Sequence, residues 1–168
     1  MDLTTQHDCT VISLDGQWDY VLDYADTGEL EQWYLCWNDR QQGQVTFPGT
    51  LTTNQVGEVQ AWSELMDPDT VRSLRQRHRY VGVAWYQHHV KLPDDWDGKR
   101  LTLYLERVMW ASSLWVNGRF AGRQDSLSTP HEFDITNLVT AGESNSVILR
   151  IDNRDIHHPA NSYGYLRE

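Results

Sequence analysis

The sequence predicts an all-β fold, a two-sheet β-sandwich, on three observations. Several segments alternate apolar and polar residues with the two-residue period of a half-buried strand. An Asn117-Gly118 pair separates two segments as in a tight β-hairpin. Helical patterning is limited to the turn that Asp67-Pro68-Asp69 would start. Such strand and turn signals are typical of sandwiches, and a jelly-roll strand order is compatible with them.

Two segments, 101–105 and 147–152, are predicted to be inner strands. Side chains alternate across a strand, so the three leucines of the first segment share one face. We expect Leu103 and Leu149 to be buried on facing strands of the sandwich. The second segment is expected to direct Val147, Leu149 and Ile151 inward and Arg150 and Asp152 outward.

The same alternation predicts two more strands and the hairpin. Trp18, Tyr20 and Leu22 follow the turn-like Asp15-Gly16, and a longer run from Ala84 to Leu92 ends at Pro93. The segment 50–79 is a long excursion, which in a compact β domain is usually a functional loop. No repeat or linker divides the chain, so residues 1–168 are interpreted as one domain.

Composition excludes several partners. The formal net charge of −10 repels a phosphate backbone, so we expect no nucleic acid partner. No apolar run is long enough to cross a bilayer and no signal peptide is visible, which predicts a soluble domain with no membrane partner, and a cytoplasmic location is favoured over others. Cys9 and Cys36 are expected to be free thiols.

Aromatic residues are the unusual feature of the composition. The chain has eight Trp and eight Tyr but only three Phe. Rings that carry a polar group suit both sugar stacking and sheet cores. In an all-β domain we expect most of these rings to be structural.

Motifs along the chain resemble the N-terminal sugar-binding domain of family 2 glycoside hydrolases. Their order and spacing cover roughly residues 14–155, although none is specific alone. Within the family the chain is most similar to β-galactosidase-like members, through the loop that ends in residues 79–86. The motifs are Leu14-Asp15-Gly16-Gln17-Trp18, Phe47-Pro48-Gly49-Thr50-Leu51, Tyr80-Val81-Gly82-Val83-Ala84-Trp85-Tyr86, Leu92-Pro93-Asp94-Asp95-Trp96, Trp115-Val116-Asn117-Gly118, Thr129-Pro130-His131-Glu132-Phe133-Asp134-Ile135-Thr136 and Arg150-Ile151-Asp152-Asn153-Arg154.

The resemblance implies a galactose-binding-like jelly roll that precedes an immunoglobulin-like domain and a catalytic (β/α)₈ barrel in a longer glycosidase. The family's two catalytic glutamates belong to the barrel, and no segment here matches the barrel motifs. The partners implied are a β-galactoside-like carbohydrate and the other domains of the parent enzyme. The runner-up interpretation is a freestanding carbohydrate-binding module, and a third is a structural sandwich without sugar contact.

No catalytic residue is assigned within the chain. Retaining glycosidases need two carboxyl groups about 5 Å apart, and no such pair can be nominated. Glu106 followed by Arg107 is interpreted as a structural ion pair. His157-His158 near Asp152 is not expected to bind a metal, because neighbouring side chains of an extended chain point in opposite directions. No cofactor is expected.

The segment that follows the last predicted strand holds most candidate sugar ligands. It is polar, aromatic and rich in turn residues, and amides, carboxylates and imidazoles can all bind hydroxyl groups. An ordinary exposed exit loop is the alternative. Arg72, Arg75, Arg77 and Arg79 could bind a carboxylated sugar or a neighbouring domain, or could form a solvated face. The predicted substrate-binding residues are Asn153, Asp155, His157, Asn161 and Arg79.

Overall fold

The computed structural model describes residues 10–38, 40–59 and 77–154. Apart from one short 3₁₀ turn, its regular elements are all strands. Its elements are β1 (Gly16–Asp23), β2 (Gly43–Phe47), β3 (Glu58–Val59), β4 (His78–Arg79), β5 (Val83–Lys91), the 3₁₀ turn η1 (Asp94–Trp96), β6 (Thr102–Leu105), β7 (Ala111–Val116), β8 (Arg119–Asp125), β9 (His131–Asp134) and β10 (Ser144–Asp152). The turn expected at Asp67 lies outside the described residues.

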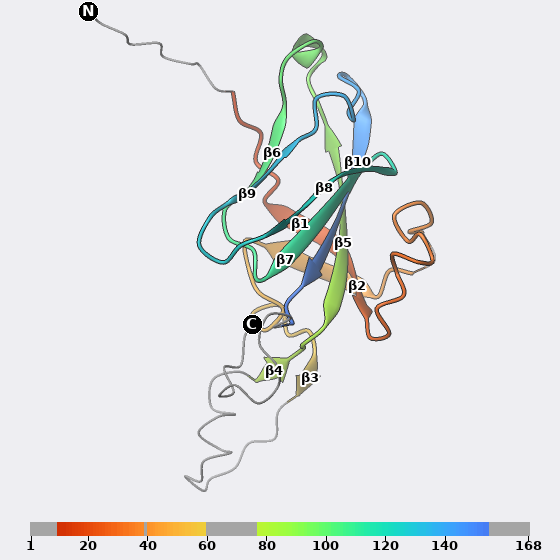
Figure 1. The fold of residues 1–168 in the computed structure, drawn as a ribbon, viewed down its shortest axis with the longest axis vertical. Coiled ribbons are helices and arrows are strands. Elements are labelled where there is room, and N and C mark those ends of the chain that lie inside the picture. Colours follow the sequence, from red (N-terminus) through yellow and green to blue (C-terminus); the bar gives the residue numbers. More distant parts are fainter. Residues whose placement is uncertain (1–9, 39, 60–76, 155–168) are drawn as a thin grey trace, which may run out of the picture.

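The strands form two layers and a small terminal ribbon. A six-stranded sheet runs in the order β2-β1-β5-β10-β7-β8, with antiparallel pairing throughout. The antiparallel pair β6-β9 faces one side of this sheet, as Figure 1 shows. The ribbon β3-β4 lies at the end of the molecule where β10 ends. The predicted two-sheet β-sandwich is confirmed.

The inner core lies between the six-stranded sheet and β6-β9. Leu103 and Phe133 from the small sheet pack with Leu114, Tyr86 and Leu149 from the large one in a single apolar cluster. Because side chains alternate along each strand, every second residue enters this core. The burial of Leu103 and Leu149 on facing strands is therefore confirmed.

The outer face of the six-stranded sheet is also covered, which the sequence did not predict. The segment between β1 and β2 crosses this face, on the side opposite β6 and β9 (Figure 1). Its Trp33 and Trp37 are buried against Trp85, Trp115 and Ile148 in a second apolar cluster. Most tryptophans of the described part are thus structural, as expected.

This cover buries two residues that were correctly predicted to face outward. Arg150 and Asp152 do lie on the outer face of β10, but only 5% and 3% of their surfaces are exposed. Alternation correctly assigned the face, whereas burial depends on a segment more than 100 residues earlier in the chain. A charged residue in that position needs a partner, because an isolated buried charge is costly.

The predicted hairpin between β7 and β8 is present. Asn117 and Gly118 both have positive φ, 51° and 75°, as a type I′ turn requires. The Asn117 side chain also accepts a hydrogen bond from the backbone nitrogen of Ser146 at 2.9 Å and donates one to the Asn145 side chain at 2.8 Å. The turn is thereby fixed to the start of β10.

Three smaller expectations have different outcomes. Cys36 carries a free, exposed thiol, whereas Cys9 lies outside the described residues. Glu106 and Arg107 are both exposed, and the ion pair expected between them is not found in the described part of the chain. Within that part, no helix is both long and apolar enough to cross a membrane.

Candidate functional site

Asn153, the first residue after β10, uses its side chain to hold the chain beside β5. Its Oδ1 accepts a hydrogen bond from the backbone nitrogen of Gly82 at 2.8 Å, and its Nδ2 donates one to the backbone oxygen of Tyr80 at 2.9 Å. The Asn153 backbone nitrogen donates to the Gly82 oxygen at 3.2 Å. Three hydrogen bonds therefore join the exit of β10 to the entry of β5.

The entry of β5 is itself fixed by Tyr80. The Tyr80 hydroxyl donates a hydrogen bond to the backbone oxygen of Val83 at 2.8 Å, and the ring is buried. Burial, with the nearby Tyr24 and Asp23, raises the pKa of this phenol, so Tyr80 stays a neutral donor. The surface to which Asn153 binds is thus a rigid turn.

Four charged groups surround the same exit. Arg154 Nη2 donates to Asp26 Oδ2 and to Asp152 Oδ2, both at 2.6 Å, and Arg154 Nε donates to Asp152 Oδ1 at 2.8 Å. The buried Arg150 donates from Nη2 to Asp26 Oδ1 at 2.7 Å. Asp26 lies in the covering segment, so the cluster links that segment to the end of β10. Such charge-assisted bonds are stronger than neutral ones.

The arginines keep both carboxyl groups ionised. Burial alone would raise the pKa of Asp26, but hydrogen bonds from Arg150 and Arg154 outweigh it and leave that pKa below its usual value. For Asp152, burial is likewise outweighed by the hydrogen bonds from Arg154, and its pKa is also lowered. These carboxylates therefore act as fixed negative charges rather than as proton donors.

Asp23 connects the same end of the sheet to the start of the covering segment. Its Oδ1 accepts from the backbone nitrogen of Thr27 at 3.0 Å, and its Oδ2 accepts from the Gly28 nitrogen at 2.8 Å and from Trp85 Nε1 at 3.1 Å. Gly28 is needed because a Cβ there would lie 2.6–2.8 Å from Trp85, Asp23 and Trp33. The covering segment thus begins in a tightly packed turn.

The structure places two of the five predicted site residues, and the other three lie outside the described residues. Asn153 is at the exit as expected, but its amide binds the protein's own backbone, so it positions the exit segment. Arg79 is half-buried in β4, opposite Glu58 in the β3-β4 ribbon. Asp155, His157 and Asn161 lie outside the described residues. Sequence reasoning missed Asp26 and Arg154 as a linked pair, although Arg154 belongs to a motif that it had singled out.

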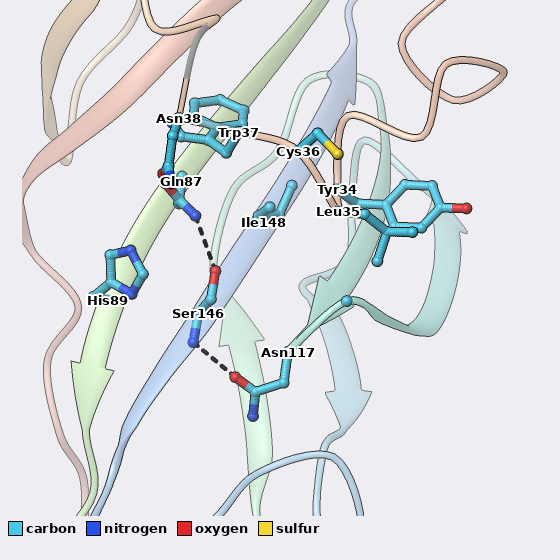
Figure 2. A pocket seen from close by; sticks show the side chains of 11 residues that line it. Tyr34, Leu35, Cys36, Trp37, Asn38, Gln87, His89, Asn117, Ser146 and Ile148 are labelled. Atoms are coloured by element: carbon cyan, nitrogen blue, oxygen red, sulfur yellow. Dashed lines mark hydrogen bonds between the residues drawn. The ribbon is translucent and has the colours of Figure 1, made fainter.

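A second feature lies at the other end of the outer face. A shallow depression of about 580 Å³ opens between the covering segment, β5, β10 and the hairpin turn (Figure 2). Gln87 and His89 come from β5, and Ser146 from β10, with Gln87 Nε2 donating to Ser146 Oγ at 3.0 Å. The full lining is Tyr34, Leu35, Cys36, Trp37, Asn38, Gln87, His89, Asn117, Gly118, Ser146 and Ile148.

Comparison with known families decides the relationship. Residues 11–157 match the model described as glycosyl hydrolases family 2, sugar binding domain. The chain belongs to this family. The matched residues include the sandwich, the three hydrogen bonds that Asn153 makes to the entry of β5 (the Asn153 clamp) and the charge cluster at the exit of β10. These features therefore belong to the family 2 sugar-binding domain of this protein.

Individual relatives of the family 2 sugar-binding domain are glycosidases of two kinds. A β-glucuronidase of Homo sapiens is 30% identical over 137 residues, 77% of this chain and 18% of that protein. A β-galactosidase of Thermoanaerobacter pseudethanolicus is 34% identical over 77 residues, 45% of this chain and 10% of that protein. The chain thus spans less than a fifth of the length of these two relatives.

Solved structures support the same fold. The Ruminococcus gnavus β-glucuronidase crystallised with uronic isofagomine aligns with a TM-score of 0.66 and 20% identity, covering 84% of this chain and 20% of that one. At this identity the likeness shows that the family 2 sugar-binding domain has the expected sandwich.

Proposed function

We propose that this chain is the non-catalytic sugar-binding domain of an exo-acting family 2 glycosidase and that its exit segment contributes sugar contacts to an active site on another domain. The observation that carries the proposal is the rigid anchoring of the β10 exit. Asn153 binds the entry of β5 there, and Arg154 joins Asp26 to Asp152. This anchor fixes the position and direction in which the chain leaves the domain.

The carboxyl groups with lowered pKa support a non-catalytic role. A retaining glycosidase needs one carboxyl group that holds a proton near neutral pH and a second about 5 Å away. Asp26 and Asp152 approach one another through Arg154, but both have lowered pKa values. The exposed Glu31 and Asp134 have lowered pKa values too, through hydrogen bonds from Trp33 and from Thr136. None of these four suits a proton donor.

The contacts that we assign to the exit segment are those of Asp155, His157 and Asn161, with Arg79 as a further candidate at the same end of the domain. Carboxylate, imidazole and amide groups bind sugar hydroxyls, and a guanidinium binds a carboxylate in bidentate fashion. The resemblance favours a β-galactoside as substrate, whereas the names of most relatives favour a β-glucuronide. Arg79 would contribute more to the second substrate than to the first.

Comparing the 168-residue chain with the complete gene product that contains it tests this role. Each is assayed with chromogenic β-galactoside and β-glucuronide. The proposal predicts hydrolysis by the complete product and none by the chain alone. Hydrolysis by the chain that survives repurification would contradict it. A complete product without a further domain and without activity would favour the alternative of a freestanding carbohydrate-binding module.

A further inference from the structure

Asp26 lies in the turn that begins the covering segment, and its backbone has a conformation that few residues adopt. Its φ is +54°, in the left-handed region, which aspartate tolerates better than most residues other than glycine. The Asp26 backbone nitrogen donates to the Asp23 oxygen at 3.3 Å, and the Asp23 carboxylate accepts from the two backbone nitrogens that follow Asp26. The Asp26 carboxylate therefore extends from a turn that is fixed on both sides.

This carboxylate joins two arginines that lie four residues apart. Asp26 Oδ1 accepts from Arg150 at 2.7 Å, and Asp26 Oδ2 accepts from Arg154 at 2.6 Å. The Arg150 side chain is buried on β10, whereas Arg154 is the second residue after that strand and is partly exposed. One charge thus connects the covering segment both to the last strand and to the chain that leaves it. A non-glycine residue held at positive φ with such contacts is a reason to look for a function.

Asn153 and Arg154 hold the exit of β10 from two different directions. Asn153 contacts the entry of β5, which is the neighbour of β10 within the six-stranded sheet. Arg154 contacts Asp26, which belongs to the segment that covers the outer face of that sheet. A chain held by one contact can still rotate about it, whereas two contacts in different directions also fix the direction in which the chain continues. Residue 155 is next in the chain, so a change in this direction is passed on to it.

The contact between Arg154 and Asp152 cannot replace the contact with Asp26. Arg154 Nε and Nη2 both bind the Asp152 carboxylate, but these two residues are close neighbours at the end of one strand. A contact of this kind does not relate the exit to another element of the fold. Without Asp26, the buried Arg150 would keep Asp152, at 3.7 Å, as its carboxylate partner among the described residues. The two arginines would then share Asp152, so the loss of Asp26 would disturb the exit through both.

We propose that Asp26 is a positioning residue, which sets the direction of the exit segment through Arg154 and thereby the fit of that segment's sugar contacts at the active site. This inference rests on the proposed function, because it concerns how those contacts are placed. It gives the covering segment a task beyond closing the outer apolar cluster. Asp26 is not among the residues to which we assign sugar contacts, so its effect on catalysis passes through the exit segment.

A double-mutant cycle in the complete enzyme tests this dependence. Asp26→Asn keeps the shape of the side chain and the tolerance for a left-handed backbone but removes the charge. When the exit segment is intact, this substitution should lower kcat/KM about tenfold, because small misplacements of binding groups slow catalysis strongly. In an enzyme that already carries Asp155→Ala and Asn161→Ala, the contacts to be positioned are absent. There, Asp26→Asn should change kcat/KM by less than about twofold.

Two further variants separate position from stability. Leu103→Ala removes an inner-core side chain from the small sheet, away from the exit, and should leave kcat/KM unchanged at a temperature where the variant is folded. Arg154→Met removes the same contact from its partly exposed side and should lower kcat/KM as Asp26→Asn does. It keeps the test decisive if Asp26→Asn does not fold. Unfolding curves of each variant set the assay temperature.

Two results would overturn the inference. One is an unchanged kcat/KM in Asp26→Asn and in Arg154→Met while the exit-segment double variant lowers it, and the proposed function would then stand without a role for Asp26. The other is an effect of Asp26→Asn that is equally large with and without the exit contacts, or that Leu103→Ala reproduces. An unchanged kcat/KM in the exit-segment double variant would contradict the proposed function, and this inference with it, so the two failures can be told apart.

Discussion

The Asn153 side-chain oxygen lies 2.8 Å from the backbone nitrogen of Gly82, 71 residues earlier in the chain. This contact closes the domain at the point where its last strand ends, because the same amide also binds the Tyr80 carbonyl. A structural role for Asn153 follows, and the sugar contact that its position suggested stays a prediction.

Replacing Asn153 by alanine should therefore destabilise the domain. Two partly buried backbone groups would be left without their partners. A buried group without a partner costs up to about 1–3 kcal/mol, and because water can partly replace the amide here, we expect a total loss of about 2 kcal/mol. Urea unfolding measures the change. Asn137→Ala, at an exposed position, should leave the unfolding free energy within about 0.5 kcal/mol of the wild type. An equally small effect for Asn153→Ala would show that the clamp contributes nothing to stability.

The Asp26 cluster should make stability depend on acid pH. The pKa of Asp26 is lower in the folded protein than its ordinary value of 3.8, so the folded state favours the ionised form. The resulting stabilisation is fully present above pH 3.8 and disappears as the pH falls through the lower, folded-state pKa. Asp26→Asn should destabilise the domain by about 1–3 kcal/mol near neutral pH, because Arg150 and Arg154 would no longer have their charged partner.

The difference between wild type and Asp26→Asn is the quantity to follow in urea unfolding as the pH is lowered. It should begin to shrink below pH 3.8, where the unfolded carboxyl group binds a proton, and should be lost as the pH falls through the lower pKa of the folded state. Carboxyl groups outside this cluster titrate in both proteins and cancel in this difference, whereas Asp152 shares its arginines with Asp26 and contributes to it. A difference that stays constant with pH would contradict the linkage.

The inner core predicts large effects at two leucines. Leu103→Ala and Leu149→Ala should each destabilise the domain by about 2–5 kcal/mol, because both side chains are buried in the same apolar cluster. Tyr104→Ala, one residue away but on the exposed side of β6, should cost less than either. Thermal or denaturant unfolding makes the comparison, and equal costs at positions 103 and 104 would mean that the strand faces are reversed.

The tight packing of the turn that starts the covering segment predicts that adding one carbon atom at Gly28 lowers the unfolding free energy. Gly28→Ala places a Cβ within 2.8 Å of three side-chain atoms and should destabilise the domain by about 1–3 kcal/mol through overpacking. Gly98→Ala is the control, since φ is +72° there but no atom lies within 4 Å. Its cost should be limited to about 1 kcal/mol of backbone strain. A smaller decrease in unfolding free energy at Gly28 than at Gly98 would show that the turn is loosely packed.

Local patterns predicted what depends on local chemistry. The alternation at Leu103 and Leu149 correctly placed the inner core, and Asn117-Gly118 correctly placed the hairpin because positive φ is a property of those residues. The outward direction of Arg150 was correctly predicted, but its burial was not, since its partner Asp26 lies 124 residues away and no period in the sequence reveals it.

At the candidate site, too, local patterns were informative and contacts between distant residues could not be predicted. Polarity after β10 suggested Asn153 as a sugar ligand, which stays a prediction, whereas the two backbone partners of its amide could not be predicted because backbone carries no signal in a sequence. Trp37 could have been suspected as a covering residue from its size alone, yet only the packing of the segment between β1 and β2 shows which face it covers.

The role of the exit segment at an active site on another domain is tested most directly by kinetics of the complete enzyme carrying Asp155→Ala and Asn161→Ala. We expect kcat/KM on its preferred chromogenic glycoside to fall roughly tenfold or more for each strong hydrogen bond to the sugar that is removed, while the Tm of the enzyme stays close to the wild-type value. An unchanged kcat/KM in this double variant would contradict that role and leave the segment as a plain connector.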